Sequence, residues 1–226
     1  MKKKYLLSVI IPVFNEEETI SQVLLKVKKT KHDKEIIVVN DGSTDKTGQI
    51  LKKEKRIILI NLPKNYGKGF ALRKGIKAAN GNIIIVQDAD LEYDPVDFDK
   101  LIAPIIGGAK VVYGSRFAKN QKEMFLTQKF ANKILTLLTN LLFGSSISDM
   151  ETGYKVFASG VIKNLNWRAK RFDFEPEITA KILKAGIKIY EVPITYHSRG
   201  YQEGKKITWF DGLVALKSLF WYRFFD

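Results

Sequence analysis

Two carboxylates, one residue apart, follow a run of β-branched residues near the middle of the chain. The segment reads Ile83-Ile-Ile-Val-Gln-Asp88-Ala-Asp90-Leu-Glu92. The apolar run predicts a buried strand, and ligands of open α/β sheets bind at the carboxyl ends of strands. Hard divalent cations take a few carboxylates together with phosphate oxygens of a substrate, so Asp88 and Asp90 could hold a metal and a nucleoside diphosphate. Aspartates also simply end strands and begin turns, and this segment alone leaves both interpretations open.

Strands that alternate with helices must position these carboxylates. The expected strands of the first half are Leu6–Phe14, Glu35–Asn40, Ile57–Leu62, Ile83–Val86 and Lys110–Tyr113. Helices are expected between them, one of them beginning at Asp94-Pro95, where an N-cap aspartate precedes a proline. This alternation predicts an α/β fold, a mainly parallel sheet with helices on both faces.

The first of these helices has a start signal of its own. Asn15 has the position of an N-cap, and Glu18, three residues later, completes the spacing of a capping box. We therefore predict a helix from Asn15 to about Lys29. Its apolar residues recur at helical spacing and predict a buried face, made of Ile20, Val23, Leu24 and Val27.

The second half of the chain is organised differently. Apolar residues between Phe125 and Phe143 form a stripe on a long expected helix, and an amphipathic helix is expected at about 208–225. The aromatic and basic residues of this last helix would suit a helix lying on an anionic bilayer, although core packing would use the same residues. The apolar residues of the earlier helix could be core, membrane contact or dimer surface. We predict one domain, with a nucleotide-binding half at about 1–116 and an acceptor- and membrane-facing half at about 117–226.

Composition restricts the classes of partner and compartment. Lys and Arg number 38 against 24 acidic residues, an excess that favours anionic partners such as nucleic acid, anionic lipid or phosphorylated substrates. No helix-turn-helix, zinc-finger or RNA-binding signature is found. The chain has no cysteine, which fits a reducing compartment, and the short apolar run after the basic amino terminus predicts a first strand rather than an export signal. No window of about 20 residues is apolar enough to span a membrane.

Four segments together go beyond a general α/β pattern. They are Ile10-Ile-Pro-Val-Phe-Asn-Glu16, Val38-Val-Asn-Asp41-Gly-Ser-Thr-Asp45, Asp88-Ala-Asp90 and Gly114-Ser-Arg116. In this order and spacing they resemble the family 2 inverting glycosyltransferases of GT-A fold, and among these the polyprenyl- (dolichyl-) phosphate mannosyl- and glucosyltransferases. The resemblance extends to Asp149-Met-Glu-Thr-Gly-Tyr-Lys155, Phe172-Asp-Phe-Glu-Pro-Glu177 and the segment from Arg199 to Ile207.

The resemblance implies an activity and a set of partners. The expected reaction moves a hexose from a nucleotide sugar, GDP-mannose or UDP-glucose, to a polyprenyl phosphate. It further implies Mg or Mn as cofactor, attachment to the cytoplasmic face of a membrane as a peripheral protein, a possible membrane-embedded partner and no nucleic acid.

The resemblance also implies roles for individual residues. The expected nucleotide-sugar site consists of Pro12, Phe14, Asn15, Glu16, Val39, Asp41, Asp88, Ala89, Asp90, Arg116, Arg199 and Lys205. The expected metal ligands are Asp90 and Glu92, where Glu92 replaces the glutamine that is frequent in the mannosyltransferases and adds negative charge. Arg116 is expected to bind phosphate, and Arg199 with Lys205 and Lys206 is expected to close over the reaction centre. The expected catalytic residues are Asp88, Asp90, Arg116 and Arg199.

The residues themselves leave alternatives to these roles. Arg116 could be a surface arginine paired with a nearby acid, and the basic segment after Arg199 could be a solvated loop. The acceptor could also be a hydroxyl group, which needs a base, and Asp149 or Glu151 would then be the candidates. A nucleic-acid- or membrane-binding module without catalysis is a third hypothesis, because the chain is strongly basic.

Overall fold

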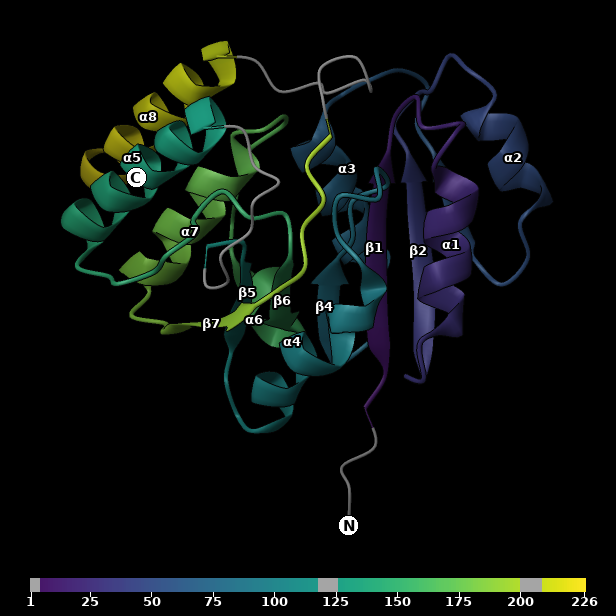
Figure 1. Ribbon diagram of the computed structural model, residues 1–226, viewed down its shortest axis with the longest axis horizontal. Helices are drawn as coiled ribbons and strands as arrows, with labels where there is room; N and C mark the ends of the chain where they lie inside the picture. Colours follow the sequence, from purple (N-terminus) through teal and green to yellow (C-terminus); the bar gives the residue numbers. More distant parts are fainter. Residues whose placement is uncertain (1–4, 118–125, 200–208) are drawn as a thin grey trace.

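The computed structural model describes residues 5–117, 126–199 and 209–226, and its centre is one seven-stranded sheet (Figure 1). The strand order is β3-β2-β1-β4-β6-β5-β7. The strands are β1 Leu7–Val13, β2 Lys34–Asn40, β3 Ile58–Asn61, β4 Ile83–Val86, β5 Val111–Ser115, β6 Lys155–Ala158 and β7 Ile189–Pro193.

Strand β6 runs against the direction of the other described strands. It pairs antiparallel with β4 on one side and β5 on the other, whereas β1, β2, β3 and β4 pair in parallel, as do β5 and β7. The carboxyl ends of β1, β2, β4 and β5 therefore meet at one edge of the sheet. The segment that leads into β6 arrives at the same edge, so the topology gathers every strand-end motif of the sequence there.

Helices cover both faces of the sheet, which confirms the predicted fold class. They are α1 Ile20–Lys29, α2 Thr47–Lys53, α3 Lys68–Ala78, the short 3₁₀ turn η1 Pro95–Asp97, α4 Phe98–Ile106, α5 Leu126–Phe143, α6 Ser159–Asn164, α7 Phe174–Lys184 and α8 Trp209–Phe224. Helices α1 and α4 pack on one face. Helices α3, α6 and α7 pack on the other, with α5 and α8 beside α7 (Figure 1).

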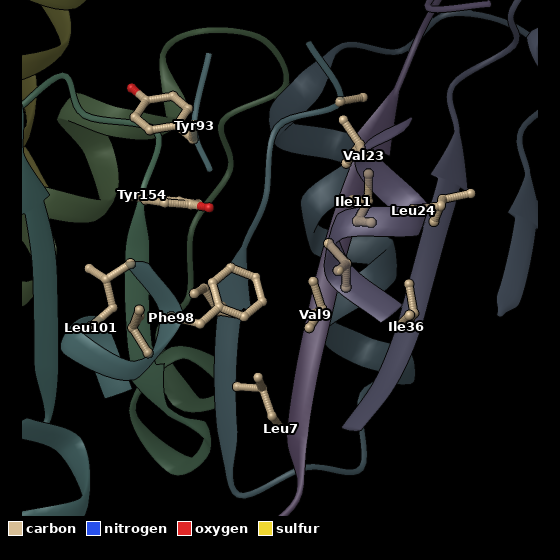
Figure 2. Close-up of a cluster of buried hydrophobic side chains, with 14 of the residues drawn as sticks. Leu7, Val9, Ile11, Val23, Leu24, Ile36, Tyr93, Phe98, Leu101 and Tyr154 are labelled. Atoms are coloured by element: carbon tan, nitrogen blue, oxygen red, sulfur yellow. The ribbon is translucent and has the colours of Figure 1, made fainter. Parts of the chain in front are cut away.

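Alternating side chains of β1 divide the apolar core into two layers. Val9 and Ile11 point to the layer under α1 and α4, and Figure 2 draws both in this layer, with Ile11 nearer to Val23 of α1. Ile10, between them, points to the opposite layer under α3. All seven residues of β1 are buried, as expected for a central strand covered on both faces. The two layers hold the strand ends, and hence the loops that follow them, in fixed positions.

The predicted start of α1 is wrong. The helix begins at Ile20, and its buried residues are the four that the sequence predicted. Asn15 instead has a φ of 51°, a left-handed conformation that asparagine tolerates better than most residues. Its side-chain oxygen accepts a hydrogen bond from the Thr44 amide at 2.8 Å. The side chain therefore joins two strand-end loops and is not available as a helix cap.

The apolar stripe of α5 is largely exposed to solvent. Phe130, Ile134, Leu137 and Leu141 are exposed, whereas Leu135 on the neighbouring face of the helix is buried. Helix α8 packs beside α5 and exposes a second apolar group, Leu213, Phe220, Trp221, Phe224 and Phe225. Core packing thus does not account for these exposed apolar residues of α5 and α8. None of the helices in the described ranges has the length and apolar character that crossing a membrane requires.

Candidate functional site

A cavity of about 760 Å³ opens at the edge where the strand ends meet. Ten of the residues that the family resemblance implied line it: Pro12, Phe14, Glu16, Asp41, Asp88, Ala89, Asp90, Glu92, Arg116 and Arg199. They come from five separate segments of the chain. Their assembly around one cavity follows from the parallel strands, since each segment leaves the sheet at the same edge.

Three other predicted site residues are not among the described residues that line the cavity. Val39 is fully buried in the core layer beneath α3, because its place in β2 points it away from the cavity. Asn15 does not line the cavity and is bound to the loop after β2. Lys205, like the neighbouring Lys206, lies outside the described residues.

Asp90 is surrounded by negative charge. Burial, followed by the charges of Asp88 and Glu92, raises the pKa of its carboxyl group from 3.8 to about 8. Glu16 adds a smaller repulsion. Carboxylates that crowd together without a cation favour the protonated form of one of them. A bound cation would remove this penalty, so the donor set fits Mg or Mn, both of which prefer carboxylate oxygens.

Glu92 is held in place by the segment that follows β7. Its Oε2 accepts a hydrogen bond from the Tyr196 hydroxyl at 2.9 Å, and its Oε1 accepts one from the Arg199 amide at 2.9 Å. These bonds orient the carboxylate and leave it lone pairs for a metal. Within the described ranges, no three acidic or histidine side chains are already arranged around a common metal position.

Arg199 closes one side of the cavity by an ion pair. Its Nη1 lies 3.0 Å from Glu16 Oε2, and the Thr19 hydroxyl donates to the same carboxylate oxygen at 2.8 Å. The hydroxyl of Thr19 also lies 2.8 Å from the carbonyl oxygen of Ala89. The ends of β1 and β4 and the segment after β7 are therefore tied together at the cavity.

Asp41 fixes the loop that precedes α3. Its Oδ1 accepts a hydrogen bond from the Tyr66 amide at 2.8 Å and its Oδ2 accepts one from the Gly67 amide at 2.7 Å. Burial raises the pKa of Asp41, and these two bonds oppose the rise. Gly67 has a φ of 98°, and a Cβ there would lie 2.4 Å from the carbonyl oxygen of Lys170. Only glycine fits this position without displacing the backbone.

A lysine whose side chain is 15% exposed bridges two acids that are far apart in the sequence. Lys68 Nζ lies 2.9 Å from Asp88 Oδ1 and 2.9 Å from Glu175 Oε1. Burial alone would lower the pKa of Lys68, but the two carboxylates outweigh it and the pKa is raised well above its ordinary value. Sequence reasoning missed this bridge. Lys68 is the first residue of α3 and Glu175 lies in one of the segments that carry the family resemblance, but neither position indicates the other.

Gly153 allows the segment before β6 to approach this bridge. A Cβ at this position would lie 2.2 Å from Asp88 Oδ2, so a side chain would displace the carboxylate. The Gly153 amide donates to the Tyr93 hydroxyl at 2.7 Å. The close approach brings the neighbouring Glu151 to the wall of the cavity.

Arg116 is paired with Asp149 by two parallel hydrogen bonds. Arg116 Nε donates to Asp149 Oδ2 at 2.8 Å and Nη2 donates to Oδ1 at 2.7 Å. The Arg116 amide also donates to Oδ2. Both side chains are buried, so Arg116 is paired with an acid, as in the alternative that the sequence allowed, but not at the surface. Arg116 nevertheless lines the cavity, and it retains donors beyond those that Asp149 uses.

The two acids that the sequence offered as bases differ sharply in the structure. Asp149 is completely buried and accepts three hydrogen bonds from Arg116, which removes it from the reach of a substrate. Glu151 lines the cavity. Burial, followed by the charge of Glu175, raises the pKa of Glu151 to about 7, although Lys155 and Arg116 oppose the shift.

Comparisons with known proteins agree with this geometry. The model of the family described as Glycosyl transferase family 2 matches residues 8–165. The UDP-N-acetylglucosamine–dolichyl-phosphate N-acetylglucosaminyltransferase of Methanococcus voltae is 35% identical over 214 residues, which cover 84% of this chain and 84% of that protein. The undecaprenyl-phosphate 4-deoxy-4-formamido-L-arabinose transferase of Photorhabdus laumondii is 30% identical over 88% of this chain, which spans 62% of that longer protein.

A solved structure supports the fold. Glucosyl-3-phosphoglycerate synthase from Mycobacterium tuberculosis, in complex with Mn²⁺, uridine diphosphate and phosphoglyceric acid, matches with a TM-score of 0.76 and 20% sequence identity. The match covers 100% of this chain and 81% of that one. At this identity it confirms the arrangement of the sheet and helices. The family resemblance and the α/β fold predicted from the sequence are both confirmed.

Proposed function

Because the chain belongs to glycosyl transferase family 2 and is a glycosyltransferase, we propose that it moves a hexose from a nucleotide sugar to a polyprenyl phosphate. The observation that carries this proposal is the cavity, which is lined both by the acids Glu16, Asp88, Asp90 and Glu92 and by the cation Arg116. A nucleotide sugar and a lipid phosphate are both anions. A site that joins them needs one region for a metal-bound diphosphate and cationic side chains for the second phosphate.

The nucleotide-sugar end of the site lies at the first strands. Pro12, Phe14 and Asp41 line this part of the cavity and are proposed to hold the nucleoside. Asp90 and Glu92 would hold Mg or Mn, which neutralises charge on the departing diphosphate when bound. The relative from Methanococcus voltae is named for a UDP sugar, so UDP-N-acetylglucosamine joins UDP-glucose and GDP-mannose among the proposed donors.

The acceptor end of the site lies at Arg116 and Arg199. A phosphate monoester is ionised near neutral pH, so its oxygen can attack the anomeric carbon without a catalytic base. The new bond forms on the face opposite the diphosphate while the bond to the diphosphate breaks, and the configuration inverts. The arginines orient the acceptor and offset the repulsion between the two anions. Both relatives reported above are named for lipid phosphate acceptors.

The exposed apolar faces of α5 and α8 are proposed to rest on the membrane that holds the acceptor. Phe130 and Leu141 on α5 and Trp221 and Phe224 on α8 are exposed, and Lys129, Lys133, Lys217 and Arg223 belong to the same two helices. Aromatic residues combined with basic residues are typical of helices that lie on anionic bilayers. The second half of the chain would thus face the lipid, and the first half would hold the nucleotide. The protein would lie on the cytoplasmic side of the membrane, beside any membrane-embedded partner.

A hydroxyl acceptor is the second candidate, and Glu151 is the observation that favours it. A hydroxyl group must lose its proton during transfer. Glu151 lines the cavity and has a pKa raised by burial to about 7, which suits a general base near neutral pH. Asp149 would not serve, because Arg116 occupies its carboxylate.

Thermal unfolding with nucleotides tests the donor half of the proposal. Ligands that bind the folded state raise the melting temperature. We expect UDP or GDP, each alone and with Mn²⁺, to raise it, with a larger rise when the metal is present. If neither diphosphate shifts the transition in either condition, the chain does not bind a nucleotide sugar in this way.

A transfer assay with radiolabelled donors tests the acceptor half. Labelled sugar should move to a polyprenyl phosphate but not to the corresponding polyprenol. Transfer to the polyprenol, with a loss of rate at acidic pH that disappears in Glu151→Gln, would instead establish the hydroxyl acceptor, because a general base is inactive when protonated.

A further inference from the structure

Two buried carboxylate oxygens at the cavity have no partner in the described chain. Glu175 lies in the first turn of α7 and is 4% exposed. Its Oε1 binds Lys68, while its Oε2 accepts no hydrogen bond from a described residue. Glu151 Oε1 is likewise buried and without a described partner. Both residues line the cavity. Buried polar atoms are normally satisfied, so two orphan oxygens on one wall indicate the position of a ligand.

The surrounding charges exclude two classes of ligand. An anion such as phosphate would be repelled by the two carboxylates. A second cation is unfavourable as well, because Lys68, Lys155 and Arg116 already lie among these acids. The remaining class is a neutral molecule with several hydrogen-bonding groups, and a sugar is such a molecule.

The pair can both donate and accept hydrogen bonds. Glu175 is anchored by Lys68 at 2.9 Å, so its free oxygen is an acceptor. Glu151 sits beside this charge in a buried position and is a natural site for a shared proton, which makes it a donor. Neighbouring hydroxyl groups of a sugar ring also donate and accept. The arrangement therefore matches a pair of hydroxyl groups better than it matches a single ionic group.

We propose that Glu151 and Glu175 form the subsite that binds hydroxyl groups of the transferred sugar. This inference rests on the proposed function and assigns Glu151 to donor specificity rather than to a base. Lys68 links the subsite to the rest of the donor site, because it binds Glu175 and Asp88 at the same time. The diphosphate would lie on the Asp90 side of this lysine and the sugar on the Glu175 side.

Calorimetric titration tests the subsite by comparing each nucleotide sugar with its own diphosphate. The probes are UDP-glucose and UDP-N-acetylglucosamine against UDP, and GDP-mannose against GDP, all with Mn²⁺. For the donor that wild type prefers, Glu151→Leu should lower the ratio of sugar-nucleotide affinity to diphosphate affinity by about 10-fold. The diphosphate affinity itself should stay within about twofold, which also shows that the variant is folded. Glu151→Gln can still donate and accept and should keep most of the preference.

The control variant is Glu54→Ala, which removes a glutamate paired with Lys28 away from the cavity. It should leave the affinity ratio unchanged. An unchanged ratio in Glu151→Leu would overturn the sugar subsite while leaving the proposed function intact. So would a Glu151→Gln variant that binds donors normally but has lost turnover, because that is the behaviour of a base. If wild type binds neither UDP nor GDP, the proposed function itself is wrong, and the subsite with it.

Discussion

Glu35 and Asp90 lie at opposite edges of the same sheet and have opposite electrostatic surroundings. Glu35, near the start of β2, accepts hydrogen bonds from the Ser8 hydroxyl at 2.5 Å and from the amides of Asn80 and Gly81. Burial raises its pKa, but these bonds outweigh burial and the pKa is lowered. Asp90, after the end of β4, has a pKa raised to about 8 by burial and by the charges of Asp88 and Glu92.

The difference separates a carboxylate that stabilises the fold from one that is placed for a ligand. At Glu35 the protein itself supplies donors for the charge, so ionisation favours the folded state. At Asp90 the protein supplies further negative charge, so ionisation is costly until a cation arrives. Strongly perturbed pKa values of this second kind are concentrated at functional sites. The predictions below test whether the two edges differ in this way.

The largest expected effect is on turnover. Asp90→Asn keeps the size of the side chain but removes its charge, so transfer of sugar should fall by on the order of 10³-fold. Asp88→Ala should also abolish turnover, because it removes an acid from the same edge. The measurement is transfer of labelled sugar, with circular dichroism to show that each variant is folded. Glu35→Gln is the matched control and should transfer sugar at a rate within about twofold of wild type. Wild-type turnover by Asp90→Asn would rule out the metal-assisted mechanism.

The next effect is on stability at the buried pair of Arg116 and Asp149. Asp149→Ala leaves the guanidinium buried without its partner, and such losses cost about 3–5 kcal/mol. Urea unfolding should show this decrease in the free energy of unfolding. A fully stable Asp149→Asn variant whose turnover no longer fell at acidic pH would show instead that Asp149 acts as a base, as the sequence allowed.

A smaller effect is the pH dependence of stability that Asp90 causes. The folded-state pKa of Asp90, about 8, lies above its ordinary value of 3.8, so the folded state binds this proton more tightly. The stability linked to the proton is fully present below the ordinary value and is lost as pH rises through about 8. Compared with Asp90→Asn, the metal-free wild type should therefore lose stability between about pH 5 and about pH 9.

Metal binding offers an independent measurement of the same proton. A carboxylate must be deprotonated to bind a metal, so Mn²⁺ binding at neutral pH should release a proton from wild type. Calorimetry in buffers of different ionisation enthalpy detects this release. Asp90→Asn should release less, and equal release from both proteins would contradict the raised pKa of Asp90.

The sequence predicted the sheet and its strand-end acids because these depend on local patterns. β-Branched runs followed by aspartates determine where strands end, and parallel topology then brings Asp41 and Asp90 to one edge. The cap at Asp94 is also local, and it is confirmed by the bond from the Val96 amide to the Asp94 side chain. The capping box at Asn15 failed because a tertiary contact with Thr44 competes for the same side chain.

The missed features depend on residues distant in sequence. The bridge from Lys68 to Glu175 joins α3 to α7, and the pair of Arg116 and Asp149 joins the end of β5 to the segment before β6. In each pair, the sequence around one residue gives no indication of which residue it contacts. The outward position of the α5 stripe was equally hidden, since helical periodicity identifies an apolar face but not what covers it.

The smallest expected effect is at Glu35. Glu35→Gln keeps an acceptor for the Ser8 hydroxyl. In wild type the hydrogen bonds go to a charged oxygen, and they become weaker when that oxygen is neutral. The free energy of unfolding should therefore fall by about 1 kcal/mol at neutral pH. Because the folded-state pKa of Glu35 is lowered, its contribution is present above the ordinary pKa and is lost as pH falls through the folded value. Wild type and Glu35→Gln should therefore converge in acid, whereas wild type and Asp90→Asn should diverge in base. Urea unfolding of wild type, Glu35→Gln and Asp90→Asn at acidic, neutral and basic pH measures both differences in the free energy of unfolding. If the free energies of unfolding of Glu35→Gln and wild type differed by the same amount at every pH, the carboxylates at the two edges of the sheet would not differ in the way proposed.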